Sequence, residues 1–420
     1  MHKLEVFGGK KLRGKINISG SKNASLPILA ATILSDQKIH LSNLPRVKDI
    51  ETMINLLKFI GSNIKLSNDK KSISIQNNNN LKLYAPYSLV KTMRAGILVL
   101  GPMLARFKKA KVSLPGGCSI GTRPIDIHLR CLSKLGVKYN IYNGYVFAEA
   151  KKGLTGNKIK FPKISVGATE NLIIAACMAK GKTILSNCAI EPEIKDLIKF
   201  INKIGGRIKW IGKRTVKIIG VKNFKKNDYK IMPDRIESGT YMMAAAITEG
   251  NILINGIDPK IIKTEIDILK TIGVKIKTSK NNIRVIGTNK IKNINIKTSP
   301  YPGFPTDLQA QLMVLLCKAR NYSIINEEIF ENRFMHCAEL NRMGAKIVTK
   351  TNKAFIEGNI IFKSAELMAT DLRASVSLIL AALSAKGKST INRIYHLDRG
   401  YEEIEKKLRK VGARIKRVHG

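Results

Sequence analysis

One pattern recurs six times along this 420-residue chain: a stretch with helical periodicity, an apolar residue, a glycine and then an alternating, strand-like stretch. It reads "FINKIGGRIKWI" in the third copy and "LKTIGVKIKTS" in the fourth. The glycines stand 68 to 75 residues apart, at Gly61, Gly136, Gly205, Gly273, Gly344 and Gly412. A glycine at the end of a helix commonly adopts the left-handed conformation that closes the last turn, so we predict helix, turn and strand in every copy.

Each copy has a second helical stretch upstream, made of small apolar residues, as in "ENLIIAACMA" and "SGTYMMAAAIT", and a short strand follows it. Helices that are apolar nearly all round are expected to be buried. The repeat of about 70 residues is longer than that of a typical solenoid, whereas three copies make a domain of plausible size. The pattern therefore predicts an α/β chain in two similar halves of three units each, divided near "YKIMPDR".

The net charge of +44, from 74 basic and 30 acidic residues, is the only feature that favours a nucleic-acid-binding protein. The lysines are spread evenly among many isoleucines and asparagines, which indicates a compositional bias, and aromatic residues make up only 6% of the chain. No apolar run reaches the roughly 20 residues of a membrane span. The first residues lack the apolar core of a secretory signal, so we expect a cytoplasmic protein without a nucleic-acid or membrane partner.

Polar residues interrupt the apolar pattern at two places in each repeat, the start of the buried helix and the loop after the inner strand. The helix starts carry Lys22, Asn23, Arg94, Asp307, Asp371 and Arg373. The loops carry Cys118, Arg123, Glu191, Glu193, Arg333, Asp398 and Arg399. Basic side chains beside the unpaired N–H groups of helix N-termini form anion sites.

Each of these residues also has a structural alternative. Asp307 and Asp371 precede helices and would serve as N-caps, and Glu191 and Glu193 would cap the helix that follows Pro192. Arg123, Arg333 and Arg399 would be surface charges. Cys118 would be a small buried residue, although the glycines of "LPGGCSIGTRP" favour a loop that moves or that a ligand approaches closely. The six cysteines contain no CxxC pair, which argues against a zinc site or a disulfide framework.

Taken in order, these segments resemble the UDP-N-acetylglucosamine 1-carboxyvinyltransferase family of enolpyruvyl transferases. The motifs that carry the resemblance are "LPGGCSIGTRPIDIHL", "SVGATEN", "MPDRIESGTY", "YPGFPTDLQAQ", "IFENRFMH" and "ATDLRAS". The resemblance implies two inside-out α/β barrel domains, each of three repeated units with buried helices and outer sheets. It implies a first domain at 22–231, a second at 1–21 plus 232–420, and an active site in the cleft between them.

The implied reaction moves the enolpyruvyl group of phosphoenolpyruvate to the 3-hydroxyl of UDP-N-acetylglucosamine and releases phosphate. It proceeds by addition and elimination through a tetrahedral intermediate, needs no metal or organic cofactor, and is the first committed step of peptidoglycan precursor synthesis. The resemblance also implies that the antibiotic fosfomycin targets the enzyme. The sister enzyme that uses shikimate 3-phosphate is the nearest alternative, but "PGGCSIGTRP" with its cysteine favours the sugar-nucleotide branch.

The resemblance further assigns roles to individual residues. Cys118 would donate the proton to phosphoenolpyruvate, and Asp307 would take the proton of the sugar hydroxyl. The expected anion-binding residues are Lys22, Arg123 and Arg399 toward the phosphate, Arg333 and Arg373 toward the carboxylate, and Arg94 in the same cluster. The remaining expected substrate contacts are Asn23, Arg123, Pro124, Ile125, Asp126, Ile127, Lys163, Ser165, Val166, Gly167, Ile329 and Asp371.

Overall fold

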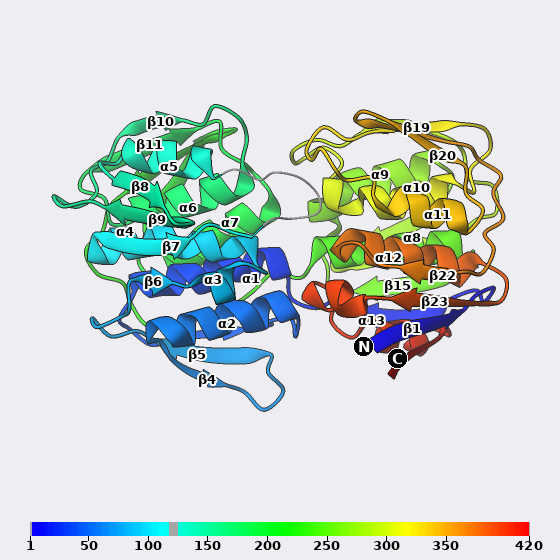
Figure 1. The fold of residues 1–420 in the computed structure, drawn as a ribbon, viewed down its shortest axis with the longest axis horizontal. Helices are drawn as coiled ribbons and strands as arrows, with labels where there is room; N and C mark the ends of the chain where they lie inside the picture. Colours follow the sequence, from blue (N-terminus) through cyan, green and yellow to red (C-terminus); the bar gives the residue numbers. More distant parts are fainter. Residues whose placement is uncertain (1, 117–124, 420) are drawn as a thin grey trace. The chain divides into compact units, whose positions relative to one another are not determined.

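The computed structural model describes residues 2–116 and 125–419, which form two compact units (Figure 1). Among these residues, unit 1 consists of 2–19 and 233–419, and unit 2 consists of 20–116 and 125–232. The described chain passes between the units at Ser19–Gly20 and at Met232–Pro233. In unit 1 the Asp234 N–H donates to the Ser19 carbonyl, and in unit 2 the Ser21 N–H donates to the Met232 carbonyl.

Six four-stranded sheets, three per unit, are formed by the described residues, and all share one topology. In the spatial order in which the strands are given below, the first strand of each sheet is parallel to the second, and the other two pairings are antiparallel. In unit 2 the sheets, in spatial order, are β14 (Asn227–Lys230), β3 (Ile39–Ser42), β5 (Ser72–Gln76), β4 (Asn63–Leu66); β6 (Tyr84–Ala85), β7 (Lys109–Ser113), β9 (Tyr145–Glu149), β8 (Lys138–Tyr142); and β10 (Lys158–Lys160), β11 (Lys182–Ser186), β13 (Thr215–Ile219), β12 (Arg207–Gly212).

Unit 1 repeats this arrangement with strands from both ends of the chain. Its sheets are β2 (Arg13–Asn17), β15 (Asn251–Asn255), β17 (Asn282–Ile286), β16 (Lys275–Ser279); β18 (Asn295–Lys297), β19 (Ser323–Asn326), β21 (Lys353–Ile356), β20 (Ile347–Lys350); and β22 (Glu366–Met368), β23 (Lys388–Asn392), β1 (His2–Phe7), β24 (Arg414–His419). Because β1 pairs with both β23 and β24, the two ends of the chain are joined in one sheet.

The helices upstream of each inner strand are buried inside their unit, as their apolar composition predicts. They are α1 (Lys22–Ala31), α4 (Leu100–Phe107) and α6 (Val166–Ala176) in unit 2, and α8 (Arg235–Ile247), α10 (Gln309–Leu316) and α12 (Leu372–Ser384) in unit 1. Every residue of α8 is buried, and α8, α10 and α12 pack against one another. The sheets lie outside these helices, and β8 is exposed along its whole length. The expected inside-out α/β fold is therefore confirmed.

The second helix of each repeat is amphipathic and ends one to three residues before the repeated glycine. These helices are α2 (Lys48–Ile60), α5 (Asp126–Ser133), α7 (Pro192–Lys203), α9 (Lys263–Thr271), α11 (His336–Arg342) and α13 (Ile404–Lys410). All six repeated glycines have a φ between +92° and +110°, which confirms the predicted left-handed turn. None of the helices in the described part of the chain combines the length and the apolar composition needed to cross a membrane.

Candidate active site

Three of the predicted site residues in unit 1 meet at one carboxylate. Asp307 lies in the 3₁₀ turn η4 (Thr306–Leu308) that precedes α10, Arg333 lies between β19 and α11, and Arg373 lies in the first turn of α12. Arg333 Nη2 donates to Asp307 Oδ1 at 2.9 Å, and Arg373 Nη2 donates to Asp307 Oδ2 at 2.7 Å. The arginine side chains are 4% and 6% exposed, whereas that of Asp307 is 25% exposed. A partly accessible carboxylate therefore bridges two buried cations.

The charges of this cluster favour a further anion. Burial alone would lower the pKa of Arg373, but the neighbouring Asp307 carboxylate, together with Tyr401 and Asp234, more than offsets this effect and raises the pKa above its ordinary value. Arg333 Nη1 is buried and has no hydrogen-bond partner among residues 2–116 and 125–419. Because two arginines face one aspartate and one buried donor is unsatisfied, the cluster can accept a carboxylate ligand.

The capping alternative holds for Asp371 but is wrong for Asp307. Asp371 is the N-cap of α12, and its Oδ1 accepts from the N–H groups of Arg373 and Ala374 at 2.7 and 3.1 Å. The N-cap of η4 is Pro305, and Asp307 lies inside the turn. Asp371 therefore stabilises the helix that carries Arg373, while Asp307 binds arginines.

Replacing Asp371 with alanine should lower the free energy of unfolding by about 1 kcal/mol, because two N–H groups at the start of α12 lose their acceptor. Asparagine is as good an N-cap, so Asp371→Asn should keep nearly all of that stability. Urea denaturation of both variants measures the difference. Equal losses in the two variants would mean that the charge of Asp371, and not its capping bond, stabilises the protein.

Arg399 and Ile329 also belong to unit 1. Arg399 is the last residue of the 3₁₀ helix η5 (Ile394–Arg399). The pKa of His396 is lowered mainly by burial and further by the charge of Arg399. The preceding Asp398 is bound through both carboxylate oxygens by Arg417, at 2.9 and 2.7 Å. Ile329 is 36% exposed. The predicted residues of unit 1 thus all lie at helix starts or in loops after inner strands.

In unit 2, Lys22 and Asn23 form the first turn of α1, which Ser21 caps by accepting from the Ala24 N–H. Lys22 Nζ lies 3.1 Å from Asp49 Oδ2, and both side chains are largely buried, with 12% and 7% exposed. Sequence reasoning did not find Asp49, which comes from the amphipathic helix α2 of the same repeat. Asp49 fixes the ammonium group of Lys22 at the helix start.

The predicted uridine-diphosphate contacts 125–127 and 165–167 lie at the starts of two helices that pack together, α5 and α6. A Cβ built on Gly167 would lie only 3.3 Å from the His128 ring. Burial, together with the nearby charge of Arg94, lowers the pKa of His128 to about 3. Two neighbouring helix N-termini provide N–H groups suited to a diphosphate. Lys163 is exposed just before α6.

Three of the predicted residues, Cys118, Arg123 and Pro124, lie outside the described residues. Glu191 is the N-cap residue of α7 but makes no capping bond with its side chain, so the capping alternative is wrong for it. Burial raises the pKa of Glu170, and the charges of Glu193 and Glu191 raise it further.

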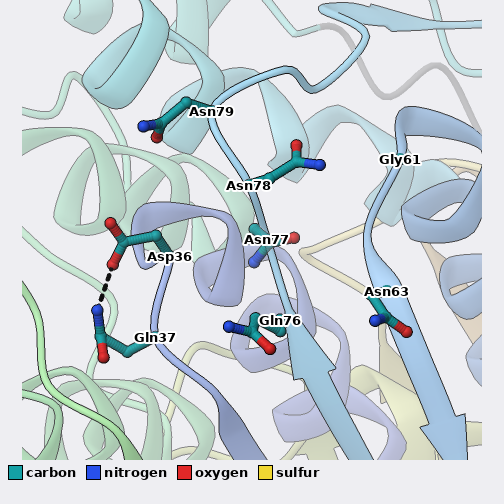
Figure 2. Close-up of a pocket in the computed structure, with 8 residues that line it drawn as sticks. All are labelled: Asp36, Gln37, Gly61, Asn63, Gln76, Asn77, Asn78 and Asn79. Atoms are coloured by element: carbon teal, nitrogen blue, oxygen red, sulfur yellow. Dashed lines mark hydrogen bonds between the residues drawn. The ribbon is translucent and has the colours of Figure 1, made fainter.

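A separate pocket of about 430 Å³ lies in unit 2 and contains none of the predicted site residues (Figure 2). It is lined by Asp36, Gln37, Gly61, Asn63, Gln76, Asn77, Asn78 and Asn79. The Asn77 amide donates to the Thr32 carbonyl at 2.8 Å and accepts from Ser62 Oγ at 2.6 Å. These bonds tie the end of β5 to the chain after α1, so Asn77 has a structural role.

Comparison with known proteins adds three findings. The family model described as EPSP synthase (3-phosphoshikimate 1-carboxyvinyltransferase) matches residues 6–408. The chain is 73% identical to the UDP-N-acetylglucosamine 1-carboxyvinyltransferase of Pelagibacter ubique and 51% identical to that of Geotalea uraniireducens, with 100% of each chain covered in both cases. Among solved structures, the enolpyruvyl transferase NikO from Streptomyces tendae is similar with a TM-score of 0.91 at 22% identity, covering 100% of this chain and 99% of that one. EPSP synthase from Acinetobacter baumannii is similar with a TM-score of 0.77 at 17% identity, covering 100% of both chains.

Proposed function

The chain belongs to the UDP-N-acetylglucosamine 1-carboxyvinyltransferases of the EPSP synthase family, and on this basis we propose that it transfers the enolpyruvyl group of phosphoenolpyruvate to the 3-hydroxyl of UDP-N-acetylglucosamine. The observation that carries this proposal is the 73% identity over the full length of a relative with that name. The reaction is an early step of peptidoglycan precursor synthesis, and phosphoenolpyruvate is a metabolite of the cell interior. We therefore also propose a cytoplasmic location.

The choice of acceptor is the point that an experiment must test, because the matching family model carries the name of the shikimate enzyme. The purified protein is supplied with phosphoenolpyruvate and either UDP-N-acetylglucosamine or shikimate 3-phosphate, and phosphate release is measured. We expect release with the sugar nucleotide alone. Release with shikimate 3-phosphate alone would overturn the proposal.

The addition step needs one base and one acid. We assign the base to Asp307, which would accept the proton of the sugar hydroxyl as the oxygen bonds to carbon 2 of phosphoenolpyruvate. Cys118 would give its proton to carbon 3. In the elimination step the intermediate loses a proton from carbon 3 and phosphate from carbon 2, which restores the enol double bond.

The bridge between Asp307 and the two arginines supports an exchange of partners when phosphoenolpyruvate binds. A ligand carboxylate that binds Arg333 and Arg373 takes over donors that Asp307 Oδ1 and Oδ2 otherwise occupy. The arginines would therefore hold the phosphoenolpyruvate carboxylate, and Asp307 would turn toward the hydroxyl. Fixed cations stabilise developing charge without rearrangement. We assign this role also to Arg94 and, at the phosphate, to Lys22, Arg123 and Arg399.

On the nucleotide side, we propose that residues 123–127, Lys163 and residues 165–167 bind uridine diphosphate and that Asn23 contacts the sugar. The paired starts of α5 and α6 support this assignment, because their N–H groups can bind phosphate oxygens. We further propose that Ile329 contributes a substrate contact, since this apolar side chain is partly exposed.

Replacing Arg399 with alanine should weaken phosphoenolpyruvate binding more than UDP-N-acetylglucosamine binding. The reason is that Arg399 is assigned to the phosphate and belongs to unit 1, whereas the proposed uridine-diphosphate contacts belong to unit 2. A loss of about 10-fold or more in affinity for phosphoenolpyruvate is the typical effect of removing a charged hydrogen bond. Isothermal titration with each substrate separately measures the effect, and equal losses for both would contradict the assignment.

A further inference from the structure

Tyr401 is a buried tyrosine that the catalytic assignments above leave without a role. It follows Arg399 and Gly400 at the end of η5, and only 3% of its surface is exposed. Arg373 Nη1 donates to the Tyr401 hydroxyl at 3.2 Å, and the guanidinium carbon lies 5.6 Å from the centroid of the Tyr401 ring. Tyr401 thus contacts the same guanidinium whose other terminal nitrogen, Nη2, binds Asp307.

The hydrogen-bond directions around Tyr401 follow from proton counting. Thr240 Oγ1 donates its one proton to the Ile236 carbonyl at 2.9 Å, so it must accept from the Tyr401 hydroxyl at 2.8 Å. The Tyr401 oxygen is then left to accept from Arg373. Gln311 Nε2 lies 3.3 Å from both the Tyr401 hydroxyl and Thr240 Oγ1, so these two oxygens share one of its protons. A tyrosine that donates to Thr240 is held in the one orientation that presents its oxygen to Arg373.

These bonds connect the three buried helices of unit 1 around one hydroxyl. Thr240 lies on α8, Gln311 on α10 and Arg373 on α12. Gln311 Nε2 also donates to the Asp307 backbone carbonyl at 3.0 Å. Tyr401 therefore links the backbone that carries Asp307 to the guanidinium that binds the Asp307 carboxylate. Burial raises the pKa of Tyr401, which keeps the phenol protonated and able to serve as both donor and acceptor.

We propose that Tyr401 is a positioning residue, which holds Arg373 and the Asp307 segment in the geometry that binds the carboxylate of phosphoenolpyruvate. This inference rests on the proposed function. Tyr401 does not touch the reacting atoms and acts through Arg373. When a ligand carboxylate displaces Asp307 from Arg373, the bond to Tyr401 remains and keeps the guanidinium in place.

Tyr401→Phe tests the proposal, because it keeps the buried ring and removes only the hydroxyl. We expect the KM for phosphoenolpyruvate to rise about 10-fold or more, as for other lost hydrogen bonds to a charged group. The KM for UDP-N-acetylglucosamine should stay near that of the unaltered enzyme. Tyr229→Phe is the matched control: Tyr229 is buried in unit 2, and its hydroxyl donates to Asp196 Oδ1 at 2.7 Å. This control should lower the melting temperature without changing either KM.

A second measurement separates this proposal from the proposed function. The guanidinium NMR signals of Arg373 are identified by their loss in Arg373→Lys. In the unaltered protein the guanidinium protons should exchange slowly with water, and in Tyr401→Phe their signals should be broadened. If Tyr401→Phe lowers only the melting temperature, or if the Arg373 signals persist unchanged, Tyr401 is not a positioning residue. If the signals broaden while the unaltered protein shows no turnover, the positioning role stands and the proposed function is wrong.

Discussion

Asp307→Asn should lower the turnover number by about 100-fold or more, the typical contribution of a general base. Asparagine keeps the shape of the side chain, but only its carbonyl oxygen can accept a hydrogen bond from an arginine, because its NH₂ group is a donor. It also cannot take a proton from the sugar hydroxyl. The KM for phosphoenolpyruvate should not rise, since both arginines remain and no carboxylate competes for them. Steady-state phosphate release with each substrate varied in turn measures both quantities.

The same substitution should also reduce stability, because two buried arginines lose their charged partner. The loss should be smaller than the roughly 3 to 5 kcal/mol of a broken, fully buried ion pair, since the Asp307 side chain is 25% exposed. Turnover must therefore be measured well below the melting temperature. Asp258→Asn is the matched control, because Asp258 caps the 3₁₀ helix η3 (Pro259–Ile262) of unit 1 through a bond to the Lys260 N–H. Near-normal turnover in Asp307→Asn would remove Asp307 from its assigned role.

The repeated architecture could be predicted because its signals are local. A helical period followed by glycine marks the end of a helix within a few residues, and each of the six glycines adopts the left-handed turn. The sheet partners could not be predicted in this way. β1 pairs with β23 and β24 from the opposite end of the chain, and β14 closes a sheet with β3. Such pairings depend on how whole units close, which no short window of sequence records.

The site shows the same limit at the level of single residues. Asp307 in "PTDLQ" and Asp371 in "ATDLRAS" share a T-D-L context, yet one binds two arginines and the other caps a helix. The difference is the 3₁₀ turn η4, which starts at Thr306 and places Asp307 inside the helical segment. Asp49 and Tyr401 were missed because each contacts its partner from another element, and neither stands in a pattern that marks it. Residue types at helix starts could thus be predicted, but their contacts could not.

Exposure to fosfomycin should produce a single covalent adduct, on the peptide that contains Cys118. Family resemblance implies that this epoxide occupies the phosphoenolpyruvate site, where its phosphonate would bind the cations assigned to phosphate. The sulfur would attack an epoxide carbon, the carbon–oxygen bond would break, and the oxygen would take a proton, leaving a thioether. Cys118 lies outside the described residues, so the expectation rests on its motif "LPGGCSIGTRP" and on the chemistry of its surroundings in sequence.

The other cysteines provide an internal control. Cys131, Cys177, Cys188, Cys317 and Cys337 are all buried thiols. Burial raises the pKa of each of them, to about 12 for Cys188 and Cys337. Since the thiolate is the reactive form, these five should remain unmodified at neutral pH.

UDP-N-acetylglucosamine should accelerate the labelling of Cys118 if it completes the site in which fosfomycin is held. Holding the epoxide against the thiol converts a bimolecular step into an effectively unimolecular one, so we expect a gain of about 10-fold or more. Intact-mass and peptide mass spectrometry after timed exposure, with and without the sugar nucleotide, measure the rate and the position of the adduct. The outcome separates two explanations, because a thiol that was merely accessible would react at the same rate in both samples. Equal rates, or labelling of any buried cysteine as fast as Cys118, would mean that Cys118 is not the residue whose reaction the substrate controls.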